Sequence, residues 1–287
     1  MVPITFFYDW DRLGDRDRQT VMYELAANGV KHLTLADNVL HMIARWPRLY
    51  REFRQEAEHA GLDFVDAHAP FAYDLDLCVP IPEVRPYMLA HLKYILQIVG
   101  DFGIGTCCVH TINKAYPEYT LEQQRDAICA SLDEILPLAE KLDVTICIEN
   151  LTRPGTSVED EIYYIEKYDS PYLGACFDSG HANIMEKGMT DPECFVYDRW
   201  PERSPKWEKD VLDRMLPYIV NCHLHDNNGF ADEHLLPGKG TVDWGTLVPK
   251  LLSAPRLKCI QSEVIPLATR QPIRPLCDKF RELFGEI

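Results

Sequence analysis

The stretch from His223 to Trp244, HLHDNNGFADEHLLPGKGTVDW, gathers three histidines and three aspartates into what reads as one loop. Imidazole and carboxylate groups are the common ligands of transition metals and the common carriers of protons in catalysis. Asp232 and His234 alternate in this stretch, so in an extended loop both side chains point the same way. The spacing therefore predicts metal binding or proton transfer.

Similar side chains stand at the end of short apolar runs elsewhere in the chain. A single histidine after a strand is more often a hydrogen-bonded loop group than a ligand, but six such positions call for a common explanation. A carboxylate at the end of a run such as VTICIE is costly to bury without a cation. A mixed set suits Zn²⁺, Mn²⁺, Co²⁺ or Fe²⁺ better than Ca²⁺ or Mg²⁺. The six positions are His68, His110, Glu149, Asp178, His223 and Glu263.

Two more histidines compete for roles. His181 follows Asp178 by three residues in FDSGHAN, and the two share a helical face if a helix begins at Ser179. The alternative is a histidine that only caps that helix. His223 and His225 lie two residues apart and so share one face of a strand, and the sequence leaves open which of them is the metal ligand.

These candidates need a scaffold that brings them together. Short β-rich runs alternate with segments of helical period, such as 84–103 and 120–143, the second with Thr120 as a plausible N-cap. This alternation predicts an α/β protein with a closed (β/α)8 TIM barrel, in which all strand ends meet at one mouth. An open doubly wound sheet is the alternative, but no glycine-rich turn follows the first strand. The eight runs are 3–9, 30–37, 62–68, 104–110, 144–150, 172–178, 219–225 and 257–264.

Size and composition narrow the class of protein. The 287 residues, without a linker-like or low-complexity tract, predict a single domain over 1–287. A formal net charge of −16 makes nucleic acid an unlikely partner, because DNA binding depends on cationic side chains. The ten cysteines lack disulfide or CxxC spacing, and several sit in apolar runs such as GTCCVH, so we expect reduced core residues.

The first residues, MVPITFFYDWDRLGDRD, lack the basic segment and cleavage site of a signal peptide. No run approaches the roughly 18 apolar residues of a membrane span. We therefore expect a cytoplasmic protein without a membrane partner.

The strongest motifs resemble a known superfamily, the xylose isomerase-like barrels, which include sugar phosphate isomerase/epimerases, ketose 3-epimerases and endonuclease IV. The resemblance covers essentially the whole chain, and its motifs are specific to the superfamily but not to a substrate. They are CIEN (147–150), GACFDSGHANI (174–184), CHLHDN (222–227), DEHLLPGKGTVDW (232–244) and SEV (262–264).

In the isomerase and epimerase branch, the resemblance implies one divalent metal ion held by Glu149, Asp178, His223 and Glu263. Glu149 and Glu263 would exchange the roles of catalytic base and acid around a metal-stabilised enediolate, and His181 would assist the substrate. Endonuclease IV implies up to three zinc ions. Here His68 and His110 would hold one, His181, Asp232 and His234 another, with Glu149 bridging and Asp178, His223 and Glu263 completing the third.

We favour a metal-dependent sugar or sugar phosphate isomerase/epimerase over a multi-zinc phosphoesterase, because the expected loops at the mouth are mixed or acidic. A barrel that only binds sugar or metal is a third possibility. We expect a small-molecule substrate, a sugar or keto-polyol, bound by His68 and His110, with Lys239 as a candidate phosphate partner. A homodimer is common among such barrels. Aromatic side chains of the loops would either cover a sugar or pack the loops themselves: Phe71, Tyr73, Tyr116, Tyr119, Phe195, Tyr197 and Trp200.

Overall fold

Eight parallel strands pair in chain order in the computed structural model, which describes residues 2–72, 75–113, 116–153, 155–188 and 207–286. Strand β1 also pairs with β8, so the sheet closes into a barrel. The predicted (β/α)8 barrel is confirmed, and the open sheet is excluded. Each strand lies inside its predicted run: β1 Ile4–Phe6, β2 His32–Leu35, β3 Asp63–His68, β4 Thr106–Val109, β5 Thr145–Glu149, β6 Leu173–Asp178, β7 Ile219–Leu224 and β8 Ile260–Ser262.

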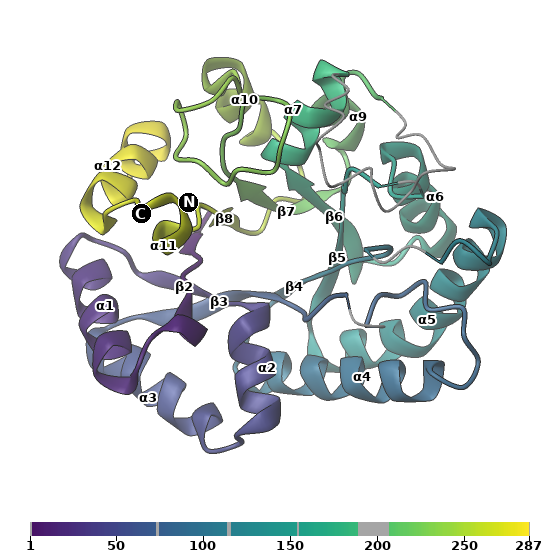
Figure 1. Ribbon diagram of the computed structural model, residues 1–287, viewed down its shortest axis with the longest axis horizontal. Coiled ribbons are helices and arrows are strands. Elements are labelled where there is room, and N and C mark those ends of the chain that lie inside the picture. The colour runs from purple at the N-terminus through teal and green to yellow at the C-terminus, as the bar shows by residue number, and fades with distance from the viewer. Residues whose placement is uncertain (1, 73–74, 114–115, 154, 189–206, 287) are drawn as a thin grey trace.

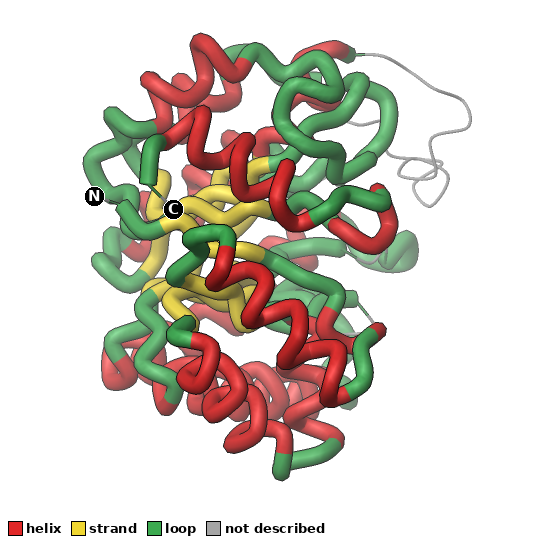
Figure 2. Tube along the Cα trace, turned by 90° about the vertical axis from the view of Figure 1, so that its left-hand side faces the viewer, coloured by secondary structure: helices red, strands yellow, loops and turns green. Residues whose placement is uncertain are grey.

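Helices surround the strands in both views (Figures 1 and 2). The last helix, α12, lies beside the first, α1, which completes the outer ring (Figure 1). Within the described part of the chain, no helix combines the length and the apolar character that a membrane crossing needs. The helices are η1 Trp10–Arg12, α1 Asp15–Ala27, α2 Asp37–Arg45, α3 Leu49–Ala60, α4 Arg85–Asp101, α5 Leu121–Leu142, α6 Val158–Tyr168, α7 Ser179–Lys187, α9 Val211–Met215, α10 Trp244–Leu251, α11 Pro266–Thr269 and α12 Ile273–Phe284.

Local sequence signals set several helix boundaries. Thr120 caps α5 as predicted, because its side chain accepts a hydrogen bond from the Gln123 backbone N–H at 3.1 Å. The Gln123 side chain in turn accepts from the Thr120 backbone N–H at 2.9 Å, which completes a capping box. The Asp178 side chain caps α7 by accepting from the His181 backbone N–H at 2.6 Å, so the helix does begin at Ser179. Each cap satisfies backbone donors that the first helical turn leaves open.

The inside of the barrel below the mouth contains polar and sulfur-bearing side chains. The Thr106 hydroxyl donates to Asp66 at 2.6 Å, and the Asn221 amide donates to the same Asp66 oxygen at 3.3 Å. Burial raises the pKa of Asp66, against its hydrogen bond from Thr106. The nine described cysteines are buried thiols outside any disulfide, as expected, and Cys194 lies outside the described residues. Hydrogen bonds between strands therefore satisfy some of these polar groups, whereas Asn221 Oδ1 and Gln261 Oε1 are buried without a partner.

Candidate metal centre

The chain itself holds the strand ends of the mouth in place. Asn150, directly after β5, accepts a hydrogen bond from the Asp178 backbone N–H at 2.8 Å and donates to the Asp178 carbonyl at 3.1 Å. One amide side chain thus ties the end of β5 to the end of β6. The Ser179 hydroxyl donates to the His225 carbonyl at 2.8 Å and so ties β6 to the end of β7. These links fix the backbone from which the candidate ligands project.

Four of the predicted residues meet at the mouth. Glu149 and Asp178 end β5 and β6, His223 lies one residue before the end of β7, and Glu263 follows β8 directly. Each offers one ligand atom, and these atoms lie within 4.8 Å of one another. His223 Nδ1 stands between the two glutamates, 3.4 Å from Glu149 Oε1 and 3.2 Å from Glu263 Oε1. Three buried or half-buried carboxylates and a histidine around one point are a donor set that fits a divalent transition metal.

The two oxygens of Glu149 face different neighbours. Oε1 faces His223 at 3.4 Å and His181 Nδ1 at 3.2 Å. Oε2 faces His110 Nε2 at 3.0 Å and His68 Nε2 at 3.6 Å. Glu149 therefore joins the four-residue group to two histidines, one that ends β3 and one that follows β4.

A further group lies toward the loop after β7. Asp232 Oδ2 is 3.3 Å from His181 Nε2 and 3.2 Å from His234 Nε2, so the three residues of the other expected ion site are in contact. His225 joins them, with Nε2 3.2 Å from Asp178 Oδ2 and its ring stacked on His234 at 4.0 Å. The structure thus brings both His223 and His225 to the mouth, in different groups.

A glycine makes room for His225. A Cβ on Gly180 would lie 2.0 Å from His225 Cε1, a distance that no side chain could keep. The glycine of FDSGHAN therefore leaves the space that the second histidine of CHLHDN fills.

Several nitrogens at the mouth are buried without a hydrogen-bond partner. His68 and His234 are oriented by backbone carbonyls, because Nδ1 of each lies 2.8 Å from the oxygen of Ala69 and of Glu263. If each Nδ1 donates, Nε2 carries a free lone pair that faces the carboxylates. Buried polar atoms without a partner are rare in folded proteins and point to a missing ligand. Here they include His110 Nδ1, His181 Nδ1, both ring nitrogens of His223, His225 Nδ1 and Asp232 Oδ1.

The neighbouring charges shift the pKa values of these groups in different directions. Burial alone would lower the pKa of His223, but Glu263 and Glu149 raise it to about 10. Burial would raise the pKa of Glu149, yet His223, His110 and His181 hold it well below its usual value. For Glu263, burial prevails over His223 and His234 and raises the pKa to about 8. For His110, burial prevails over Glu149 and lowers the pKa to about 4.

A cavity of about 360 Å³ opens above these residues. Its polar lining includes Arg12, Asn38, Asn113 and Arg153, none of which stood out in the sequence because they lie in four separate segments of the chain. Phe71 also lines it, with its ring 4.3 Å from the ring of His110. The volume lies at the small end of ligand pockets and suits a monosaccharide.

Other expected contacts with the substrate are not at this cavity. Lys239 is exposed and does not line it. The glycine-rich turn around Lys239 packs against the protein itself, since a Cβ on Gly240 would lie 2.1 Å from the Asn227 carbonyl oxygen. Of the loop aromatics, Tyr116 is buried in the hydrophobic core and Tyr119 packs against it. The remaining four, Tyr73, Phe195, Tyr197 and Trp200, lie outside the described residues.

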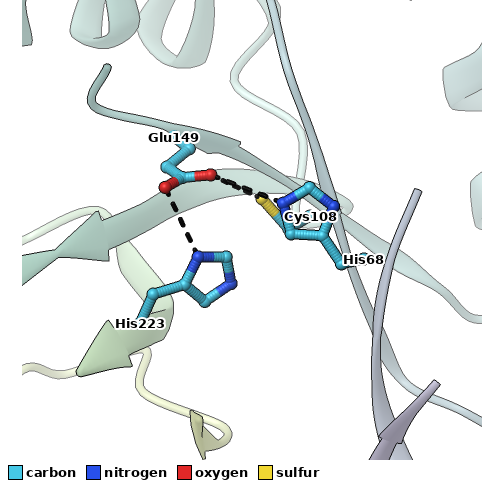
Figure 3. A group of neighbouring side chains, drawn as sticks. All are labelled: His68, Cys108, Glu149 and His223. Atoms are coloured by element: carbon cyan, nitrogen blue, oxygen red, sulfur yellow. Dashed lines mark hydrogen bonds and ion pairs between the residues drawn. The ribbon is translucent and has the colours of Figure 1, made fainter. Parts of the chain in front are cut away.

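Cys108 was predicted from GTCCVH to be a core residue, and this prediction is incomplete. Its Sγ lies 3.3 Å from Glu149 Oε2, and it belongs to a ligand-type group with His68, Glu149 and His223 (Figure 3). The sequence does contain an indication that Cys108 faces the site: it precedes His110 by two residues and so shares its face of the strand.

Comparisons with known proteins agree with this architecture. Residues 22–256 match the model of a family described as xylose isomerase-like TIM barrel. An uncharacterized protein of Methanocaldococcus jannaschii is 28% identical over 190 residues, which are 64% of this chain and 58% of that protein. The chain therefore spans less than two thirds of that relative's length.

Relatives with named activities fall into two classes. A D-psicose 3-epimerase of Enterocloster bolteae is 22% identical over 250 residues, 84% of this chain and 75% of that protein. A probable endonuclease 4 of Mycoplasmopsis synoviae is 27% identical over 124 residues, 42% of this chain and 40% of that protein. The solved D-psicose 3-epimerase of Clostridium cellulolyticum H10, with D-tagatose, shares the fold at a TM-score of 0.70, with 12% identity and full coverage of both chains.

Proposed function

The chain belongs to the xylose isomerase-like TIM barrel family, and on this premise we propose that it is a divalent-metal-dependent isomerase or epimerase of a small sugar or keto-polyol. One observation carries the proposal: Glu149, Asp178, His223 and Glu263 converge within 4.8 Å beside the cavity. The similarity to D-psicose 3-epimerases supports the same class of reaction. A bound Zn²⁺, Mn²⁺, Co²⁺ or Fe²⁺ would polarise the carbonyl of a ketose and acidify the neighbouring C–H.

The two glutamates are the groups that would move the proton. Glu149 comes from β5 and Glu263 from the segment after β8, so they approach the mouth from different sides of the barrel. One takes the proton from the substrate carbon, and the other returns a proton to the opposite face or to the neighbouring carbon. His181, 3.2 Å from Glu149 Oε1, would orient that carboxylate and donate to a substrate hydroxyl.

The cavity would bind the rest of the substrate. His68 and His110 stand on one wall, with Phe71 against both rings at 5.3 and 4.3 Å. Asn113 and Arg153, which also line the cavity, offer polar contacts for hydroxyl groups. The aromatic face of Phe71 suits the apolar side of a sugar.

The proposal is tested by metal content and by hydrogen exchange. Protein purified without chelator should hold about one or more of the four metals per chain by plasma mass spectrometry. In D₂O the protein should place deuterium on the carbon next to the carbonyl of D-psicose, D-tagatose or D-fructose. Nuclear magnetic resonance measures this exchange. A metal-free protein, or no exchange on any ketose or keto-inositol, would contradict the proposal.

Replacement of Glu263 by Gln should lower this exchange by about 10²- to 10⁴-fold, the usual cost of losing a general acid or base. The unfolding midpoint should not fall, because the change removes one of several crowded carboxylates. Glu122→Gln, an exposed change in the first turn of α5, is the matched control and should exchange like the unchanged protein. Normal exchange in Glu263→Gln would refute the role of this residue.

A multi-zinc phosphoesterase is the second candidate, favoured by the contacts of Asp232 with His181 and His234. With His68 and His110 near Glu149, every position expected for three ions lies at the mouth. The net charge of −16 argues against DNA as the substrate. Two or three zinc ions per chain, together with cleavage of an oligonucleotide that contains an abasic site, would reverse our preference.

A further inference from the structure

Cys108 belongs to a small buried cluster with Cys147, Cys176 and Val220, but its sulfur also reaches the ligand-type side chains of the mouth. It is fully buried on β4, and its Sγ points to Glu149 Oε2 at 3.3 Å (Figure 3). His68, Cys108, Glu149 and His223 each place one ligand atom within 4.8 Å of the others. The thiol therefore belongs to a compact group of ligand-type side chains from four different strands.

The histidines of this group independently indicate a missing ligand. His223 is fully buried, and neither of its ring nitrogens has a hydrogen-bond partner. His68 has Nδ1 at 2.8 Å from the Ala69 carbonyl, which leaves Nε2 facing Glu149 at 3.6 Å. A buried imidazole loses its hydrogen bonds to water, and this loss is costly unless an ion or another group binds to the ring nitrogens.

Glu149 can serve this group without leaving the four-residue group of the proposed function. Its Oε2 faces Cys108 and His68, whereas its Oε1 faces His223 (Figure 3). A carboxylate with its two oxygens on different neighbours can bridge two ions or shift one ion between two positions.

We propose that Cys108 provides a thiolate ligand to a metal ion held together with His68, Glu149 and His223. This inference rests on the metal binding of the proposed function and adds to it a ligand that the sequence resemblance does not include. Binding replaces the S–H proton, which leaves to the solvent, with a metal–sulfur bond. Thiolate is a soft ligand, so the site should favour zinc or cobalt over manganese.

Cobalt(II) reports on the ligand directly. Metal-depleted protein titrated with Co²⁺ should develop visible ligand-field bands and, in addition, a near-ultraviolet sulfur-to-cobalt charge-transfer band. Cys108→Ser should keep ligand-field bands but lose the charge-transfer band, and its zinc affinity should fall by at least about tenfold. Its preference for zinc over manganese should fall as well.

Cys147→Ser is the matched control. Cys147 is equally buried and lies in the same cluster of thiols, but it is not among the residues that share the candidate site. Its charge-transfer band should equal that of the unchanged protein. A band that survives in Cys108→Ser, or that is lost in Cys147→Ser, would overturn the proposal.

X-ray absorption of the unchanged zinc protein decides the question even if Cys108→Ser does not fold. A sulfur neighbour at about 2.3 Å supports the thiolate, and a shell of nitrogen and oxygen alone at about 2.0–2.1 Å overturns it. Metal binding without sulfur would leave the proposed function standing. Failure to bind any of zinc, cobalt, manganese and iron would remove both proposals, whereas binding of manganese or iron alone would overturn only the thiolate ligand.

Discussion

The mouth of the barrel and the buried ion pair between α1 and α3 both take charges out of water, but they do so in opposite ways. Arg18 is almost fully buried, and its Nε, Nη1 and Nη2 each donate a hydrogen bond, two to Glu56 and one to Asp15. Its guanidinium also lies over the Phe53 ring at 4.7 Å. The protein's own side chains therefore provide hydrogen-bond partners for the buried guanidinium of Arg18.

At the mouth, by contrast, carboxylates and histidines crowd together while buried nitrogens remain without partners. His223 illustrates the difference, since it lies beside two glutamates and yet has no hydrogen-bond partner at either nitrogen. A charge that finds all its partners stabilises the fold, whereas ligand atoms left open around one point are suited to bind something else. The comparison therefore separates structural from functional burial of charge.

The largest effect on stability is expected at the ion pair. Arg18→Met would leave Glu56 buried without its cation and should lower the free energy of unfolding by about 3–5 kcal/mol, measured by urea denaturation. Exchange activity per folded molecule should not change, because neither residue is among those that line the cavity.

The control for Arg18→Met is Arg48→Met, which breaks the exposed pair of Arg48 and Glu52. That change should cost no more than about 1 kcal/mol. An equal loss of unfolding free energy in the two variants would show that the buried pair stabilises the fold no more than an exposed pair does.

A smaller effect is expected from removal of metal. With free zinc at about 100 times its dissociation constant, binding should add about 2.7 kcal/mol to the free energy of unfolding, and a chelator should remove it. The urea midpoint should drop by the same amount in the unchanged protein and in Arg18→Met, because separate sites act additively. A drop in only one of them would mean that the two regions are coupled.

The smallest effect, counted per pH unit, concerns Glu161, a buried carboxylate without a cation. The Thr111 hydroxyl donates to its Oε1 at 2.9 Å, but Oε2 has no partner. Burial raises its pKa well above the ordinary value of 4.5, with Asp160, Cys108 and Glu149 adding to the shift.

Because the folded state keeps the Glu161 proton and the unfolded state loses it, this residue should lower stability as pH rises above about 4.5. Relative to Glu161→Gln, the unchanged protein should lose up to about 1.4 kcal/mol per pH unit until the folded pKa is reached. Urea unfolding of both proteins at pH 5, 6 and 7 measures the difference. Parallel stability profiles would show that Glu161 ionises normally.

Much of the fold and of the candidate site could be predicted from the sequence. Apolar runs of strand length marked all eight strands, and Thr120 marked the start of α5, because these signals depend on neighbours within a few residues. The barrel rule then placed His68, Glu149 and Glu263 at one mouth, since parallel strand ends face the same way.

Contacts between distant parts of the chain were decided only by the tertiary structure. Cys108 reads as a core thiol in GTCCVH, and only closure of the barrel brings its sulfur to Glu149. Lys239 reads as a possible phosphate partner, but the turn that carries it packs against Asn227 and leaves it exposed. The sequence by itself determined where each strand lies to within a few residues, because that is set by local periodicity. Which of them touch was decided by strand register and side-chain direction, which depend on the closed sheet as a whole.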